Sequence, residues 1–223
     1  GSMANFSLFE RAEVANFKIR TELPIYFEGE NDKWLTTLLS GCSIQSMSLV
    51  FDKSTLKNLH LVPALLRSVY CRSVEFILET FAMWHNMVEE FNSHVLVAQF
   101  AEAGVTSVTL TRLLHGRFQK GTAKKETLPK RDVFEFDILR LFIESGITKI
   151  IINENTFGGR TSSIGEAQFG IFLQNIAATS APLYIKLRQY KTSLKGGRRM
   201  QSGFRVNVDN NAGSCEEITI CSS

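Results

Sequence analysis

The sequence lacks several features that would assign a function class at once. Its longest apolar stretches are interrupted by charged or polar residues well short of the ~20 residues that a membrane-spanning helix requires. It shows no internal repeat and no low-complexity tract. Nothing after Met3 resembles a signal peptide, and Gly1-Ser2 is typical of a tag remnant. These absences predict a folded cytoplasmic protein with no membrane partner.

Cysteine and histidine are scarce, with four of each in 223 residues. Because none of them forms a Cys-x-x-Cys or His-x-x-x-His pair, the sequence predicts no metal site built from protein ligands. Cys71 lies near Arg67 and Arg72, which could lower the pKa of its thiol. No histidine accompanies it in the sequence, so a buried structural cysteine is the favoured interpretation.

Apolar segments of strand length alternate with amphipathic segments in the second half of the chain. The expected strands are His94–Gln99, Ile147–Ile152, Ala181–Tyr190 and Phe204–Val208, and the expected helices are 106–114, 132–146 and 164–176. This alternation predicts an α/β fold with a mostly parallel sheet and helices on both faces. Residues 93–223 would form an α/β phosphate-binding core.

The first half of the chain has a different pattern. Val69–Glu90 has apolar residues at helical spacing without Gly or Pro, whereas Ser46–Phe51 alternates as an early strand would. Residues 3–92 are therefore predicted to form a mainly helical N-terminal cap or hood. At the other end, Lys191–Gly203 is predicted as a loop, and Ile218–Cys221 as an edge strand or a frayed tail.

Positive charge is concentrated in two segments, although the formal net charge is only +3. Arg112–Arg131 contains seven basic residues and one acid, and Lys186–Arg205 contains seven basic residues and no acid. Such segments favour an anionic partner, which could be a phosphorylated small molecule, a nucleic acid or an acidic protein. The alternative is that both are solvated surface loops.

The segment after Ile147–Ile152 has the components of a phosphate-binding loop. Glu154 follows the strand, where open parallel sheets bind ligands, and a carboxylate there can hold ribose hydroxyls. Backbone N–H groups at a helix start, small side chains and a guanidinium favour an anion. The candidate phosphate-binding residues are Thr156, Gly158, Gly159, Arg160, Thr161 and Ser162. A plain strand-to-helix turn is the alternative.

This order of strand, acid and Gly/Thr/Ser run resembles the phosphoribosyl-pyrophosphate loop of type I phosphoribosyltransferases, over about residues 94–190. The family usually has two adjacent acids, and Asn153 occupies the first of these positions. The resemblance implies that Glu154 holds the ribose hydroxyls. It also implies a pyrophosphate loop at Ala101, Glu102, Ala103 and Gly104.

The resemblance further implies displacement of pyrophosphate at the ribose anomeric carbon, with Mg²⁺ as the cofactor that accompanies the substrate. In that family a mobile catalytic loop lies between the two ligand loops, where this chain has a basic segment. Lys120, Lys124 and Lys125 are the candidates for a closing lid, and with Glu154 they form the predicted catalytic set.

Two other hypotheses remain open. A non-catalytic module could hold nucleic acid through its basic segments, with Lys195, Arg198 and Arg199 as the candidate contacts. An interaction protein could retain the phosphate loop without using it. A homo-oligomer is compatible with each hypothesis.

Overall fold

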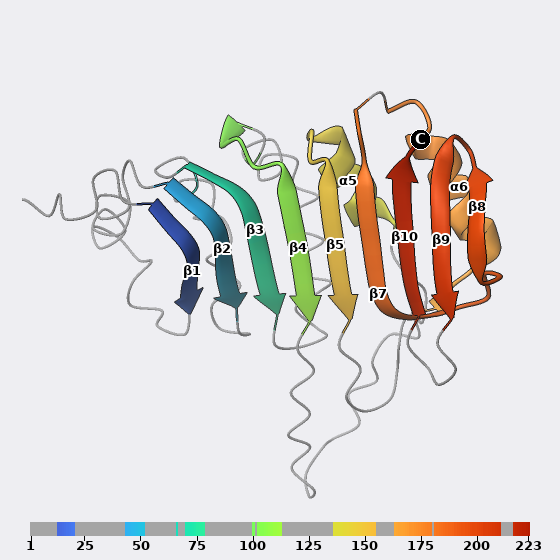
Figure 1. Cartoon of the computed structure of the whole chain (residues 1–223), viewed down its shortest axis with the longest axis horizontal. Coiled ribbons are helices and arrows are strands. Elements are labelled where there is room, and N and C mark those ends of the chain that lie inside the picture. Colours follow the sequence, from blue (N-terminus) through green and yellow to red (C-terminus); the bar gives the residue numbers. More distant parts are fainter. Residues whose placement is uncertain are drawn as a thin grey trace, which may run out of the picture.

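The computed structural model describes residues 13–20, 43–51, 66, 70–78, 100, 102–112, 136–154, 163–179, 181–210 and 216–223. Within these residues the chain forms one large sheet with two helices beside it (Figure 1). The strands are β1 (Glu13–Arg20), β2 (Ser43–Phe51), β3 (Tyr70–Leu78), β4 (Ser107–Arg112), β5 (Lys149–Glu154), β6 (Ser163–Ile164), β7 (Tyr184–Thr192), β8 (Gly197–Gln201), β9 (Phe204–Asn210) and β10 (Glu216–Ser222). The helices are α5 (Asp137–Glu144) and α6 (Glu166–Ile176).

The first part of the sheet is parallel, and its strands lie side by side in chain order, β1-β2-β3-β4-β5-β7. Crossover connections between parallel strands are right-handed, so strands that are always added on the same side send their connections over the same face. Both described helices lie behind the sheet in the view of Figure 1. An aromatic contact also links the two helical segments: Phe136, just before α5, stacks on Phe172 of α6 with ring centroids 4.7 Å apart.

The second part of the sheet is antiparallel and continues the order as β7-β10-β9-β8. β8 and β9 form a hairpin whose two turn residues, Ser202 and Gly203, both have positive φ, as a type I′ turn requires. β10 lies between β7 and β9 and pairs with both. The last strand of the chain is therefore central to this half of the sheet.

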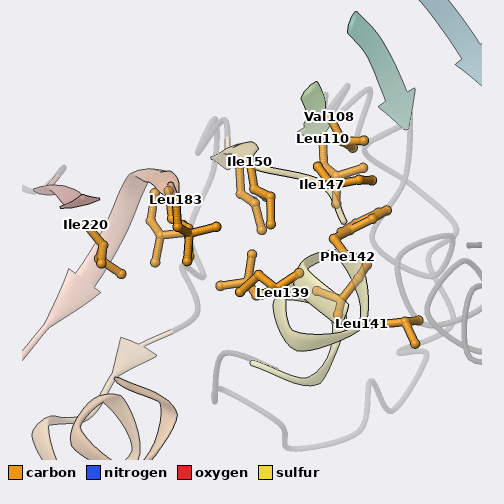
Figure 2. Close-up of a cluster of buried hydrophobic side chains, with 14 of the residues drawn as sticks. Val108, Leu110, Leu139, Leu141, Phe142, Ile147, Ile150, Leu183 and Ile220 are labelled. Atoms are coloured by element: carbon orange, nitrogen blue, oxygen red, sulfur yellow. The ribbon is translucent and has the colours of Figure 1, made fainter. Parts of the chain in front are cut away.

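The core lies between the sheet and the helices. Along the strands, buried apolar residues alternate with half-buried or exposed residues, because successive side chains point to opposite faces. Figure 2 shows Leu139 and Phe142 of α5 directed toward the strands. The apolar side chains that the central strands contribute are Val108, Leu110, Ile150, Ile152, Ile185, Leu187, Ile218 and Ile220.

The predicted fold class is wrong in two respects. The sheet is mixed rather than mostly parallel, and the two described helices pack on one face rather than on both. The predicted helical cap is also wrong, because β1, β2 and β3 come from that segment and extend the same sheet as β4. Within 69–90, the described residues Tyr70–Leu78 are extended, so tertiary pairing overrides the helical spacing of apolar residues there.

Three further predictions are corrected by strand pairing. Residues 107–112 form β4 instead of a helix, and β8 lies inside the predicted loop Lys191–Gly203. Ile218–Cys221 is a strand, but it is central rather than at the edge. β4 and β10 pair with strands distant in sequence, which local composition does not identify, whereas β8 pairs with β9 across a two-residue turn.

The most strongly patterned segments are confirmed. β5, β7 and β9 occupy the predicted strands at 147–152, 181–190 and 204–208, and α6 occupies the predicted helix at 164–176. α5 ends at Glu144, just before the predicted terminator Gly146, which has φ +83°. The next N–H, that of Ile147, donates to the Phe142 carbonyl at 3.0 Å. Glycine adopts this conformation without the steric cost that a Cβ would add.

Candidate functional site: the polar face of the sheet

The face of the sheet that points away from α5 and α6 is polar. No element of the described part of the chain lies over it (Figure 1). Its side chains form three rows that run across the strands at paired positions. The first row is Ser73, Ser107, Lys149, Tyr184, Cys221, Arg205 and Met200; the second is Glu75, Thr109, Ile151, Lys186, Thr219, Asn207 and Arg198; the third is Ile77, Thr111, Asn153, Arg188, Glu217 and Asp209. We call these residues the polar face.

A carboxylate organises the polar face over β2, β3 and β4. Glu75 accepts a hydrogen bond from Ser48 Oγ at 2.8 Å and another from Thr111 Oγ1 at 2.7 Å. Hydroxyl donors on both neighbouring strands thus hold the two carboxylate oxygens in place. This arrangement fixes the side chains of three strands and leaves Glu75 half-buried.

Asn153 extends this network to β5. Its Nδ2 donates to Thr111 Oγ1 at 3.3 Å, whereas its Oδ1 is buried and has no hydrogen-bond partner among the described residues. An unpartnered buried carbonyl oxygen is energetically unfavourable, at roughly 1–3 kcal/mol. The hydrogen-bonding groups of Asn153 are therefore less fully satisfied among the described residues than the hydroxyl of Thr111.

Ion pairs join β7 to β10. Lys186 Nζ lies 2.6 Å from Glu217 Oε1, and Arg188 Nε lies 3.2 Å from Glu217 Oε2. Glu217 is about one-third exposed, so water screens these pairs and they contribute little to stability. Their main effect is to fix the positions of two cations on the polar face.

On the β5-to-β8 side of the polar face, the acids are confined to the third row, which also carries Arg188. The first and second rows carry Lys149, Lys186, Arg198 and Arg205 from β5 to β8, with no acid among the described positions. The acids Glu217 and Asp209 lie in the third row, towards the carboxyl ends of β5 and β7. We call the positions of the first two rows on β5, β7, β10, β9 and β8 the basic rows.

No protein-family model, curated protein or solved structure matches this chain.

The structure places Glu154 and the segment Glu102–Gly104 at opposite edges of the sheet. Glu154 ends β5 and pairs with Arg112 at the carboxyl end of β4. Glu102, Ala103 and Gly104 instead precede the amino end of β4. Six residues of strand separate these edges, which is about 20 Å. Glu102–Gly104 and Glu154 therefore lie at opposite ends of the β4–β5 pair and do not contact a common ligand there.

Several predicted site residues lie outside the described part of the chain. These are Ala101, Lys120, Lys124, Lys125, Thr156, Gly158, Gly159, Arg160, Thr161 and Ser162, together with the expected strand 94–99. Within the described residues, no three His, Cys, Asp or Glu side chains gather as metal ligands would. Neither described helix is long and apolar enough to cross a membrane.

Two of the predicted nucleic-acid contacts, Arg198 and Arg199, lie on opposite faces of β8. Arg198 lies on the polar face, opposite Asn207, whereas its neighbour Arg199 points to the other face, opposite Val206. Arg199 Nη1 donates to the Lys195 carbonyl at 2.9 Å, and its Nε donates to Gln201 Oε1 at 3.2 Å. Arg198 and Lys195 are exposed, so only Arg199 is occupied by internal contacts.

Most of the polar face is not predicted from the sequence. A usable signal was present in Ser73-Val74-Glu75-Phe76 and in Ser107-Val108-Thr109-Leu110-Thr111, which alternate polar and apolar residues with the period of a strand. The helical spacing of other apolar residues in the same windows concealed it. Only strand pairing shows that Glu75 lies between Ser48 and Thr111.

Cys71 is buried as predicted, beside Ile44 of β2. Burial raises the pKa of the Cys71 thiol above its ordinary value, although backbone hydrogen bonds at Ser73 and Met47 act in the opposite direction. The unfolded chain therefore loses this proton at a lower pH than the folded chain. The contribution of the protonated Cys71 thiol to the free energy of unfolding is therefore fully present at neutral pH, and it decreases as the pH rises past 9.0.

This linkage predicts a measurable difference at alkaline pH. Urea midpoints at about pH 8 and about pH 10 should fall further for the wild type than for Cys71→Ala, which has no thiol to ionise there. Tyrosine and lysine titration affects both proteins equally and is removed by the comparison. Equal decreases in the two midpoints would show that Cys71 ionises alike in the folded and unfolded chains.

Proposed function

We propose that this protein is a non-catalytic interaction module that binds a segment of a partner protein on its polar face. The observation that carries this proposal is the strand order. For parallel strands laid down in chain order, right-handed crossovers favour connections over one face, and no element of the described residues lies over the other face. Solenoid proteins use extended surfaces of this kind to hold partners, which supports the proposal by analogy of architecture alone.

The geometry gives less support to a nucleotide site at the strand ends. Open α/β sheets bind such ligands at the point where the strand order reverses. The parallel strands described here, β1 to β5 and β7, follow one another without a reversal. The separation of Glu154 from Glu102–Gly104 does not support the paired loops that phosphoribosyl transfer would need.

A protein partner fits the polar face better than a nucleic acid does. Sheets that bind single-stranded nucleic acid stack bases on several aromatic side chains. Among the described positions of the polar face, Tyr184 is the one aromatic residue. Glu75, Glu217 and Asp209 would also repel phosphates that crossed the whole face, whereas a peptide can meet acids and bases alike.

Selection of peptides from a random phage-displayed library tests this proposal. Thr219→Trp places a bulky side chain in the middle of the polar face, and Gln168→Trp places the same side chain on the exposed side of α6. Peptides selected on the wild type should lose about tenfold or more in affinity for Thr219→Trp, because the ring fills their binding surface. Their affinity for Gln168→Trp should not change.

Circular dichroism and thermal melting confirm that both variants are folded before binding is compared. Peptides that bind Thr219→Trp as tightly as the wild type would place binding elsewhere on the molecule. Failure to select any peptide that depends on the polar face would contradict the proposed function.

A further inference from the structure

We infer that the basic rows bind an acidic segment of the partner protein, in extended form. This inference rests on the proposed function and adds the chemistry of the partner. It concerns the region from β5 to β8, where Lys149, Lys186, Arg198 and Arg205 share two neighbouring rows.

Three of these four cations are available for a partner. Lys149, Arg198 and Arg205 are exposed, and within the described part of the chain none of them forms an ion pair. Lys186 already pairs with Glu217, so its charge is largely compensated. Among the described residues, three positive charges on one surface of the sheet therefore have no compensating acid, and they repel each other weakly until an anion binds.

The spacing of these cations suits an extended peptide. From β5 to β8 the sheet spans four inter-strand steps, which is about 19 Å. A peptide in extended conformation covers this span with about six residues. A segment with acids at several of these positions could reach Lys149 at one end and Arg198 at the other while it crosses Tyr184, Thr219 and Asn207.

The position of the acids on the polar face defines the orientation of such a segment. Glu217 and Asp209 lie in the third row, next to the basic rows. An acidic peptide that moved onto the third row would meet these like charges, which disfavours that position. The acidic segment is therefore expected to cross the strands along the basic rows.

Binding of a fluorescent glutamate-rich peptide of about eight residues, followed by anisotropy, tests the inference. Arg205→Glu should reduce affinity about fivefold, since it removes an attraction and adds a repulsion in the basic rows. The matched control is Arg140→Glu on α5, which makes the same change in net charge on the helical side of the molecule and should leave affinity unchanged. Added salt should weaken binding to the wild type.

Each other result overturns the inference. Equal losses in Arg205→Glu and Arg140→Glu would mean that the peptide senses only net charge. If the peptide does not bind, an acidic partner is excluded. If an oligothymidylate binds more tightly than the peptide and Arg205→Glu abolishes that binding, the ligand of the basic rows is a nucleic acid instead of an acidic peptide. If library peptides depend on Thr219 but lack Asp and Glu, the interaction module stands and its acidic partner does not.

Discussion

Replacing Phe142 by alanine is expected to lower the free energy of unfolding by about 3–5 kcal/mol. Phe142 is completely buried, and in Figure 2 its ring lies among the apolar side chains of α5 and the strands. The side chain fills space between α5 and β4, where Val108 and Leu110 face the helix. Its removal loses apolar burial and leaves a cavity that the surrounding sheet can close only in part.

Urea denaturation followed by circular dichroism measures this loss. The matched control is Ile171→Ala on α6, where the side chain is 58% exposed and the expected change is about 0.5 kcal/mol or less. The m-value should stay constant if both variants unfold in one step. A loss below about 1 kcal/mol for Phe142→Ala would mean that α5 does not pack on the sheet as described.

Ile220→Asp is expected to lower the free energy of unfolding by about 4 kcal/mol or more, a large part of the total stability of a domain. Ile220 pairs with Ile185 of β7 on one side and with Val206 of β9 on the other, and all three are fully buried. A carboxylate there would lose its hydration without gaining a partner. Loss of β10 would also separate β7 from the β8–β9 hairpin.

Thr219→Asp is the matched control for this experiment. Thr219 precedes Ile220 in β10 and points to the polar face, beside Lys186 and Asn207. Its replacement should change stability by about 1 kcal/mol or less, mainly through the low strand propensity of aspartate. Similar losses in both variants would contradict the alternation of β10. Little loss in Ile220→Asp would support the frayed tail that the sequence alone allowed.

The segments that the sequence predicted correctly are those in which local signals agree. Glu166–Ile176 combines apolar residues at helical spacing with a preceding small-residue run, and Ile147–Ile152 is a β-branched run that follows a glycine C-cap. Tyr70–Leu78 was mispredicted because two periods coexist there. Its apolar residues fit one helical face, but Val74 and Phe76 also fit one face of a strand, and pairing with β2 and β4 selects the strand.

The polar face was much less accessible from the sequence. The basic composition of Lys186–Arg205 marks that segment as a candidate site, but it does not show that Arg198 and Arg199 face opposite ways. The acceptor role of Glu75 depends on Ser48 and Thr111, which are 27 and 36 residues away. Contacts of this length arise from strand register, which no local pattern specifies.

The sequence by itself determined where the chain is apolar with the period of a strand or a helix, because side-chain direction follows from backbone period. It also determined that positive charge gathers in two segments. Only the tertiary structure decided the strand order, the central place of β10 and the position of both described helices on one face. The reason is that pairing joins residues far apart in the chain, and the free energy gained by burying Ile185, Val206 and Ile220 together exists only once their strands are neighbours.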